Sequence, residues 1–502
     1  MSELVIGIDL GTTYSGAAYI DESGFPCMIP NKRGKNITPS VVSIVNSKSQ
    51  VGEAAKNVLI SNPDNTIDEV KRYIGSDKTY SIDGENHTPT SISALILADI
   101  KSYVESHCKK EVSSAVISVP ANFGDAQRKE TMRAAEMAGL NVEFIINEPT
   151  AAALAYAKFS NQKTSGVYAI YDLGGGTFDC TIAYIDGDNV DIKTSQGVTT
   201  LGGKDFDEEL LKIVQKKYKK IAKKELPITK YNMNIAEKDK VELSFQDEIM
   251  IFIDDVTIEV KRSEFELSIK NLVQQTMMAF EAALTSKDYS FDDLEDVILA
   301  GGSTRIPYVQ ERLEKLTGIK PEIHENPDET IALGAALYSA KKHSSSLNPN
   351  QRAAVAGLDI EEVANMNYGT FAVDETLGTY GKLNSIIIEK DTKIPCSQTR
   401  TYYTLSDNQE AIACEVTECS EHETSPEFVF VQWEGTLDLP HGRPAGQAIE
   451  VTYSYNANQS MECEFHDLSS GRKLSQTIEM AAARKEGKGS DEVDDISKFR
   501  VD

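Results

Sequence analysis

Two short segments of this chain combine aspartate, glycine and threonine in an order that suits phosphate chemistry. Asp9-Leu-Gly-Thr-Thr13 and Asp172-Leu-Gly-Gly-Gly-Thr177 each end an apolar run. Glycines let backbone amides approach a ligand closely, and successive amides in such a turn attract anions. Two such hairpins facing one another could hold the two ends of a polyphosphate. Either segment taken alone is equally typical of a plain tight hairpin.

The same segments indicate where a metal ion would lie. Asp9 and Asp172 stand where Mg²⁺ bound to phosphate needs oxygen ligands, largely through water. A third glycine pair, Gly301-Gly-Ser-Thr-Arg-Ile-Pro307, follows an apolar run and precedes a helical pattern. Free amides at such a helix start suit a nucleotide, although a plain strand-to-helix turn has the same pattern. Thr200-Leu-Gly-Gly-Lys-Asp205 offers a similar junction.

These segments must be positioned by the strands and helices around them. Apolar runs typical of strands alternate with amphipathic helical patterns up to about Lys342, which predicts an α/β fold. The expected buried strands are Val5–Asp9, Ser114–Val119, Tyr168–Asp172 and Val297–Ala300. The expected helices are Ser91–His107, Ala126–Ala138, Asp205–Lys224 and Ile306–Leu316.

The pattern of apolar and polar residues changes after this α/β part, which we assign to residues 1–342. Residues 343–367 begin with a segment rich in Ser, Asn and Pro, and are predicted to be a linker. Residues 368–482 contain short apolar runs between polar turns, which predict an all-β sandwich. Its expected strands are Ser385–Glu389, Arg400–Leu405, Ala411–Val416, Glu427–Gln432, Ala448–Tyr455 and Met461–Phe465. Residues 483–502 are charged and are expected to be a disordered tail.

Composition excludes several classes of function. The chain has 502 residues, with 51 Lys and Arg against 78 Asp and Glu, and a net charge of −27. Such a surface repels nucleic acid and anionic membranes, so any nucleotide must be held by local amides and a metal ion. Seven cysteines without C-x-x-C spacing indicate a reducing compartment. We expect a cytoplasmic protein, and a monomer because no oligomerisation signal is evident.

Four segments together resemble the signature set of the seventy-kilodalton heat-shock chaperones of the DnaK type. They are Ile8–Tyr14, Ile146–Ala153, Asp172–Asp179 and Gly301–Pro307, in the same order and spacing. The resemblance covers residues 3–342 strongly and 368–480 more weakly, through Asp407-Asn-Gln409 and Ser470-Gly-Arg472. It implies an actin-like, ribonuclease-H-like ATPase of two lobes, followed by a sandwich that grips extended peptides.

The resemblance also implies roles for individual residues. It implies ATP or ADP with Mg²⁺, possible K⁺, and catalytic roles for Lys71, Glu148, Asp172 and Thr177. Phosphates would be held by Gly11, Thr12, Thr13, Tyr14, Gly174, Gly175, Gly176 and Thr177. Metal ions would be held by Asp9 and Asp172, with Glu148 beside the water shell and Asp179 as a possible K⁺ ligand. The adenosine would be surrounded by Gly203, Glu237, Lys240, Ser244, Gly301, Gly302, Ser303, Arg305 and Asp328. The peptide cleft would involve Tyr402, Tyr403, Leu405, Ile412 and Cys414.

The chemistry of these residues is consistent with that resemblance. Phosphoryl transfer to water needs an oriented water, charge neutralisation and donors on the phosphate oxygens. Lys71 in isolation is typical of a solvated surface lysine, and Glu148 before Pro149 is typical of a helix start. Apolar residues of short strands such as Ile412 are also more often core than cleft.

The chain departs from the family pattern at several positions. Pro120 and Arg128 match a proline–arginine switch, but Asn122 stands where the family commonly has Tyr. Phe144 stands where an Arg often docks a J-domain partner, so J-domain docking is in doubt. The segment Ala353–Ala364 lacks the usual run of leucines, which predicts weaker communication between domains. The helical lid is expected to be absent, so bound peptide should leave quickly.

Three functions are compatible with the sequence. The first is a slow ATPase and chaperone that binds unfolded or extended polypeptides weakly, served by J-domain and nucleotide-exchange partners. The second is a non-hydrolysing ATP-binding relative that acts as a partner-docking co-chaperone. The third is a sugar kinase with the same twin hairpins, which needs a carboxylate base for a substrate hydroxyl and fits the β-rich final third poorly.

Overall fold

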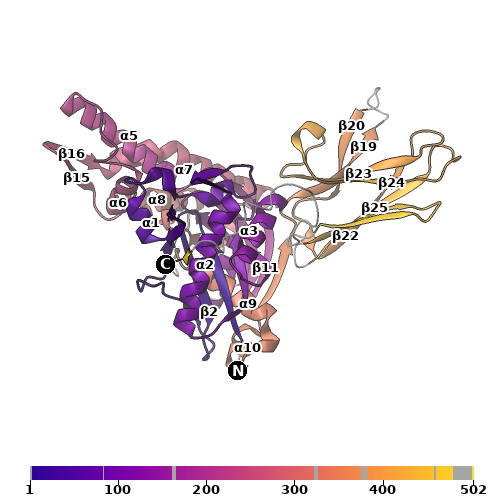
Figure 1. Ribbon diagram of the computed structural model, residues 1–502, viewed down its shortest axis with the longest axis horizontal. Coiled ribbons are helices and arrows are strands. Elements are labelled where there is room, and N and C mark those ends of the chain that lie inside the picture. Colours follow the sequence, from indigo (N-terminus) through magenta and orange to yellow (C-terminus); the bar gives the residue numbers. More distant parts are fainter. Residues whose placement is uncertain are drawn as a thin grey trace.

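The computed structural model describes residues 3–82, 84–160, 165–321, 326–374, 381–456, 460–478 and 500–501. Two α/β lobes lie together and a β-sandwich projects from one side of them (Figure 1). The sandwich, orange to yellow, lies opposite the hairpin of β15 (Glu248–Ile253) and β16 (Val256–Lys261). The all-β third and the α/β part therefore occupy different ends of the molecule.

The first lobe is built on a sheet in the order β11-β10-β1-β2-β3, with β4 paired to β2. β1 runs parallel to β10 and antiparallel to β2. Ile6 and Ile8 of β1 are fully buried, as expected for a sheet covered by helices on both faces. The strands are β1 (Leu4–Leu10), β2 (Tyr14–Ile20), β3 (Pro26–Met28), β4 (Thr38–Pro39), β10 (Val112–Val119) and β11 (Val142–Asn147). The helices include α2 (Pro89–Cys108) and α3 (Asp125–Met137).

The sheet of the second lobe is built like that of the first. Two of its strands form an antiparallel hairpin, and a third strand runs parallel to one of them. This sheet has the order β17-β12-β13-β14-β18-β21. The strands are β12 (Gly166–Leu173), β13 (Phe178–Asp186), β14 (Asn189–Val198), β17 (Leu294–Ala300), β18 (Asp359–Val363) and β21 (Lys393–Ile394). The helices are α5 (Gly203–Ala222), α6 (Met233–Leu243), α7 (Arg262–Thr285) and α8 (Pro307–Thr317). An α/β fold was predicted for both lobes, and their sheets and helices alternate in that way.

Two alanine-rich helices, α4 (Glu148–Phe159) and α9 (Thr330–Lys342), pack against each other. Their small side chains bring the backbones close. A Cβ atom added at Gly334 would lie 1.8 Å from the carbonyl oxygen of Ala151. A Cβ atom added at Gly7 of β1 would lie 2.1 Å from the amide nitrogen of Ala336. α9 is therefore held tightly against both α4 and the first sheet.

We expect Gly334→Ala to destabilise the α/β part. The added methyl group would overlap the backbone of α4, which cannot move without separating the helices. Overpacking of this kind costs about 1–3 kcal/mol or more. Urea unfolding should report a loss of at least about 2 kcal/mol. A loss below about 0.5 kcal/mol would contradict this account of the helix contact.

The segment predicted to be a linker, 343–367, contains regular structure. Helix α10 (Pro349–Val355) packs against α9, and β18 pairs in parallel with β14 of the second lobe. β18 also pairs with β21, which lies within residues 368–482. Few residues of β18 are apolar, so the strand signal is weak in the sequence. Its structure depends on the open edge that β14 offers.

The sandwich consists of two antiparallel sheets, β20-β19-β23-β24 and β22-β25-β26-β27. Val416, Tyr453 and Phe465 lie between the sheets and are almost fully buried. Pro426 begins a short 3₁₀ turn where a strand was predicted from Glu427, and the strand begins at Phe430. The strands are β19 (Asn367–Asp374), β20 (Gly381–Ile388), β22 (Cys396–Tyr403), β23 (Ala411–Cys419), β24 (Phe430–Asp438), β25 (Ala448–Tyr455), β26 (Met461–Asp467) and β27 (Lys473–Ile478).

Smaller elements complete the first lobe. They are α1 (Glu53–Val58), β5 (Val42–Val45), β6 (Lys48–Val51), β7 (Thr66–Ile67), β8 (Tyr80–Ile82), β9 (Glu85–His87) and the 3₁₀ turns Pro63–Asn65 and Val70–Tyr73. Further 3₁₀ turns span Phe291–Asp293, Gly302–Arg305 and Ser344–Ser346. Within the predicted tail, β28 (Arg500–Val501) pairs with β6, and residues 483–499 and 502 lie outside the described residues. No helix in the described part is long and apolar enough to cross a membrane.

Candidate active site

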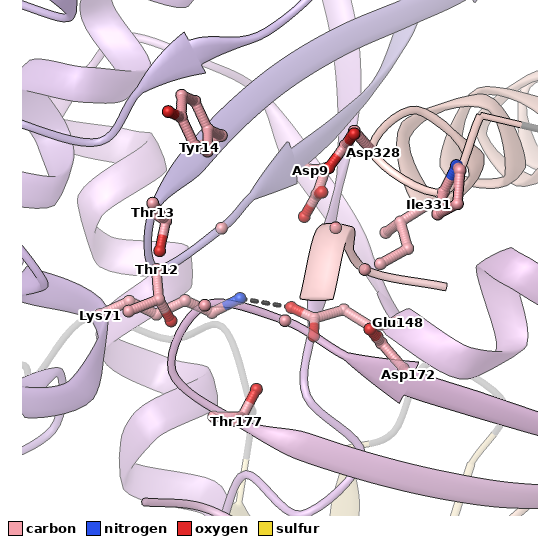
Figure 2. Close-up of a pocket in the computed structure, with 16 residues that line it drawn as sticks. Asp9, Thr12, Thr13, Tyr14, Lys71, Glu148, Asp172, Thr177, Asp328 and Ile331 are labelled. Carbon is pink, nitrogen blue, oxygen red and sulfur yellow. Dashed lines mark hydrogen bonds and ion pairs between the residues drawn. The ribbon is translucent and has the colours of Figure 1, made fainter. Parts of the chain in front are cut away.

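A cleft of about 580 Å³ lies between the two lobes. Figure 2 shows that side chains from both lobes point into it. The lining residues are Asp9, Gly11, Thr12, Thr13, Tyr14, Lys71, Glu148, Asp172, Gly174, Gly175, Thr177, Gly301, Gly302, Pro327, Asp328 and Ile331. The structure thus brings together three glycine-bearing segments that are far apart in the chain.

The two Asp-Leu-Gly hairpins face each other across this cleft. A Cβ atom added at Gly175 would lie 1.8 Å from Thr13 Oγ1, and one at Gly176 would lie 2.6 Å from Thr12 Cγ2. Glycine is therefore required where the second hairpin approaches the hydroxyls of the first. The hairpins join β1 to β2 and β12 to β13, so each sheet contributes one.

The cleft has the features expected of a polyphosphate site. The Oγ1 atom of Thr13 is buried and has no hydrogen-bond partner among the described residues. A buried hydroxyl of this kind fits a ligand that supplies an acceptor. Gly301 adopts a φ of 77°, and a Cβ atom there would lie 2.7 Å from Asp172 Oδ1. The third glycine segment therefore also presents backbone rather than side chains to the cleft.

Lys71 and Glu148 form a buried ion pair in the centre of the cleft (Figure 2). Lys71 lies on the 3₁₀ turn Val70–Tyr73, and Glu148 is the first residue of α4. The Lys71 ammonium also lies 5.8 Å from the centre of the Phe123 ring. Removing a lysine from water requires such compensation. The pair places the Lys71 ammonium, with the Glu148 carboxylate beside it, between the two hairpins.

Three further carboxylates surround this pair. Ser118 Oγ donates to Asp9 Oδ1 at 2.9 Å, and Asp172 and Asp179 lie opposite each other on β12 and β13. Burial, and then the charge of Glu148, raise the pKa of Asp9 and of Asp172. The same two causes raise the pKa of Asp179 to about 7. Four carboxyl groups therefore share one lysine, and three of them have a raised pKa.

An excess of buried carboxylates suits a bound cation, but not one chelated by side chains alone. Within the described ranges, no three His, Cys, Asp or Glu side chains are grouped so that they could hold a metal ion. Mg²⁺ commonly keeps several waters and binds through one or two carboxylates and phosphate oxygens. Asp9 and Asp172 fit that mode of binding.

A bridge between the lobes closes one side of the cleft. Lys56 Nζ of α1 lies 2.5 Å from Glu237 Oε2 of α6, and donates to the Tyr14 hydroxyl at 3.1 Å. Tyr14 in turn donates to Glu237 Oε1 at 3.0 Å. Lys56 was not predicted from the sequence, because nothing in its local sequence distinguishes it from a surface lysine. Lys204 with Asp68 and Glu69, and Arg72 with Asp205, form further pairs across the lobes.

We expect Lys56→Ala to accelerate nucleotide release about 10-fold. The substitution removes a largely buried ion pair and a hydrogen bond that must break when the lobes separate. A loss of about 1.4 kcal/mol corresponds to that factor, and such losses act mainly on dissociation. Stopped-flow release of a fluorescent ADP analogue measures it. Lys35→Ala, which removes the more exposed pair with Glu53, is the matched control and should leave the rate unchanged.

The residues predicted to surround an adenosine are only partly on the cleft surface. Gly301, Gly302 and Asp328 line it. Ser303 Oγ donates to the Gly174 carbonyl at 3.1 Å, and Lys240 donates to the Gly203 carbonyl at 2.9 Å. Arg305 lies 3.2 Å from Asp328, whereas Ser244 donates to the Lys240 carbonyl at the end of α6. Ser303 and Lys240 therefore support the glycine segments, and Ser244 contacts the backbone of Lys240.

The five residues assigned to a peptide cleft lie in different environments. Tyr403 and Leu405 are 63% and 46% exposed. Tyr402 is half-buried and its hydroxyl donates to Ser385 Oγ at 2.9 Å. Ile412 packs against the core, and Cys414 is fully buried within it. Tyr403 and Leu405 are therefore accessible to a peptide in this arrangement, and Cys414 is not. All seven cysteines are free thiols.

Two lobes around a cleft with paired glycine hairpins, and an adjoining sandwich, define a two-lobed α/β protein with an appended β domain. The family model for Hsp70 protein matches residues 5–83 and 77–500 of the chain. The chain therefore belongs to the Hsp70 family, which confirms the resemblance seen in the sequence. Members of this family are ATP-dependent chaperones with actin-like ATPase lobes and a β-sandwich. They bind ATP or ADP with Mg²⁺, unfolded polypeptides, J-domain proteins and nucleotide-exchange factors.

Proposed function

We propose that this chain is a slow ATPase and chaperone that hydrolyses ATP in the cleft and binds extended polypeptides weakly through its sandwich. The observation that carries the proposal is the position of Lys71 between the two facing hairpins. Phosphoryl transfer depends on positioning and on charge stabilisation, and these residues supply both. Family membership supports the same activity.

Each hairpin has a separate task in this proposal. The amides and hydroxyls of Thr12 and Thr13 bind one side of the phosphates, and the Gly174–Thr177 turn binds the other. Lys71 supplies positive charge beside the phosphate that is transferred, and Glu148 holds the lysine in place. Mg²⁺, when bound with the nucleotide, neutralises charge on the phosphate oxygens. The hydroxyl of Thr177 points toward the same space and can orient the attacking water (Figure 2).

Single-turnover hydrolysis tests this proposal. Excess protein is mixed with limiting radiolabelled ATP and Mg²⁺, and ADP formation is followed with time. We expect complete conversion at a slow but measurable rate. Nucleotide binding without any conversion would instead support the non-hydrolysing co-chaperone. Conversion that requires a sugar would support a kinase.

Some of the contacts between the sandwich end of the chain and the lobes are polar, and these support reduced coupling between nucleotide and peptide. Asn365 donates to Asn147 at 3.3 Å, and Lys287 lies 3.1 Å from Asp391. Polar contacts gain little net free energy because water competes for them. We expect the affinity of a fluorescent peptide to differ less than about 10-fold between ATP and ADP. A difference of 100-fold or more would show strong coupling.

Docking of a J-domain partner is proposed to be altered at Phe144. The ring of Phe144 lies 4.9 Å from Lys342 Nζ and meets the edge of His343 at 5.8 Å. These contacts place the ammonium of Lys342 over an aromatic ring, in place of a positive side chain at residue 144 itself. The chain therefore requires a partner with different chemistry at this point, or none.

A further inference from the structure

A small sheet of the first lobe is completed by a strand from the far end of the sequence. Its order is β28-β6-β5-β7. β5 and β6 form an antiparallel hairpin, and β5 pairs on its other side with β7. Among the described residues, β6 would therefore be an edge strand if β28 were removed. Figure 1 shows β28, in yellow, beside α2 and away from the sandwich.

The direction of pairing shows that β6 accepts a segment from elsewhere in the chain. Arg500 pairs with Lys48 and Val501 with Ser49, and the two strands run parallel. A tight turn joins antiparallel neighbours, whereas a parallel pair needs a long connection. β28 also contacts α2, which packs against β5 and β6. The site thus consists of the backbone edge of β6 with α2 beside it.

The composition of the last residues suits strand addition. Residues 488–495 are mostly charged, with a single apolar residue, whereas Ile496, Phe499 and Val501 follow closely together. β-Branched and aromatic residues are the types enriched in strands. An open edge offers unpaired amides and carbonyls that bind extended backbone. The apolar residues therefore gather in the part of the tail that contains β28.

The chain is long enough for this strand to come from the same molecule. Ile478 ends β27, and 21 residues separate it from Arg500 (500 − 478 − 1). Fully extended, they span at most about 70 Å. A compact chain of this length has a radius of gyration of roughly 23 Å. The connection can therefore pass from the sandwich to the first lobe without strain.

The sheet that β28 completes also supports two lysines of the cleft. β6 ends at Val51, and only Gly52 separates it from α1, which carries Lys56. β7 ends at Ile67, shortly before the turn that carries Lys71. A segment bound at β6 is therefore attached to the part of the first lobe that holds these two side chains.

We propose that the edge of β6 is a docking site for an extended segment, and that its occupant is the final segment of the same molecule, which adds Arg500 and Val501 as a strand. The contact ties the chain beyond the sandwich back to the first lobe. Backbone hydrogen bonds carry most of the recognition in strand addition. Any other extended segment must displace β28 before it can bind there.

The size of the effect follows from the tether. A flexible connection of this kind gives an effective concentration of about 1 mM. A short strand that binds with a dissociation constant of about 0.1 mM is then docked about nine-tenths of the time. Removing it should make the β6 amides that face β28 exchange with solvent about 10-fold faster.

Hydrogen exchange followed by mass spectrometry tests the proposal on the full chain. The test variant combines Arg500→Pro with Val501→Pro, because proline lacks the N–H and does not fit a strand ladder. Ser490→Pro, in the segment that precedes β28, is the matched control and should exchange as the wild type does. We expect faster exchange at residues 48–51 in the double variant alone.

A synthetic peptide of residues 496–502 provides the second arm. Added at about 1 mM to the double variant, it should restore slow exchange at residues 48–51. The same peptide with proline at both positions should not. Peptide that binds only to the sandwich leaves β6 unprotected, so the two sites are distinguished.

Three results would overturn the proposal. Equal exchange of β6 in the wild type and the double variant would show that β28 does not dock. Faster exchange that the peptide fails to reverse would show that the prolines disturb the lobe in another way. Protection that disappears when the wild type is diluted about 100-fold would assign the strand to a second copy of the chain, since a tethered segment is insensitive to dilution.

Discussion

Lys71→Ala should reduce the single-turnover rate of ATP hydrolysis by about 100- to 1,000-fold, the range measured when a preorganised stabilising group is removed. The substitution has two consequences in this structure. It removes the positive charge between the hairpins, and it leaves Glu148 buried without its partner. Lys71 is also a lowering influence on the pKa of Asp9, of Asp172 and of Asp179. Those three carboxyl pKa values should therefore rise further in the variant.

The effect should appear in the chemical step more than in binding. The hairpin amides and hydroxyls that we propose contact the phosphates remain, so Mg-ADP affinity measured by calorimetry should change less than about 10-fold. Lys212→Ala, at an exposed ion pair on α5, is the control and should hydrolyse ATP as the wild type does. A variant at Lys71 that keeps more than about a tenth of the wild-type rate would remove this lysine from the catalytic group.

The glycine hairpins were predictable from the sequence because their function depends on local chemistry. Asp9 and Asp172 each precede glycines that a backbone needs for close approach, and that requirement is visible without the fold. The buried strands β1 and β12 were visible for a similar reason, since both of their faces are apolar. The meeting of the two glycine hairpins in one cleft follows once an α/β arrangement with two sheets is assumed.

Other parts of the site depend on contacts that no local sequence pattern predicts. Lys56 and Glu237 are ordinary charged residues of two helices until the lobes come together. β18 has too few apolar residues to be recognised and forms on the edge of β14. The hairpin of β15 and β16 alternates buried and exposed residues, so a period-two pattern could have identified it. Glu418 is a strand residue next to polar neighbours, and only docking of the sandwich buries it.

Glu418 is a deeply buried charged contact between the sandwich and the lobes. It lies on β23, and both its carboxylate oxygens accept the backbone N–H of Asp125, at 3.1 and 3.3 Å. Asp125 begins α3, where the helix dipole favours a negative charge. Gln432 donates to the same carboxylate. A Cβ atom at Gly124 would lie 3.1 Å from Glu418 Oε2, so the surfaces fit closely.

The docked sandwich should be stabilised as pH falls. Burial, and then the charge of Asp125, raise the pKa of Glu418 to about 7, against 4.5 for a free glutamate. Burial likewise raises the pKa of Asp125, while Lys129 and Arg128 oppose this. The tyrosines Tyr368 and Tyr455 also face this cluster. The docked state therefore binds more protons than the undocked state between these pKa values. The stabilisation of the docked state that is linked to the proton on Glu418 is fully present below about pH 4.5. It is lost as pH rises through about 7.

The docking equilibrium should change by up to about 10-fold for each pH unit in that window, since one proton is linked to it. Small-angle X-ray scattering of the full chain measures this as a radius of gyration that increases from about pH 5.5 to about pH 8.5. Glu418→Gln keeps the acceptor for the Asp125 amide but cannot ionise, so this variant should stay compact at both pH values. Glu434→Gln, at an exposed position on β24, should expand as the wild type does. A Glu418→Gln variant that expands with the same pH dependence as the wild type would place the proton at another group.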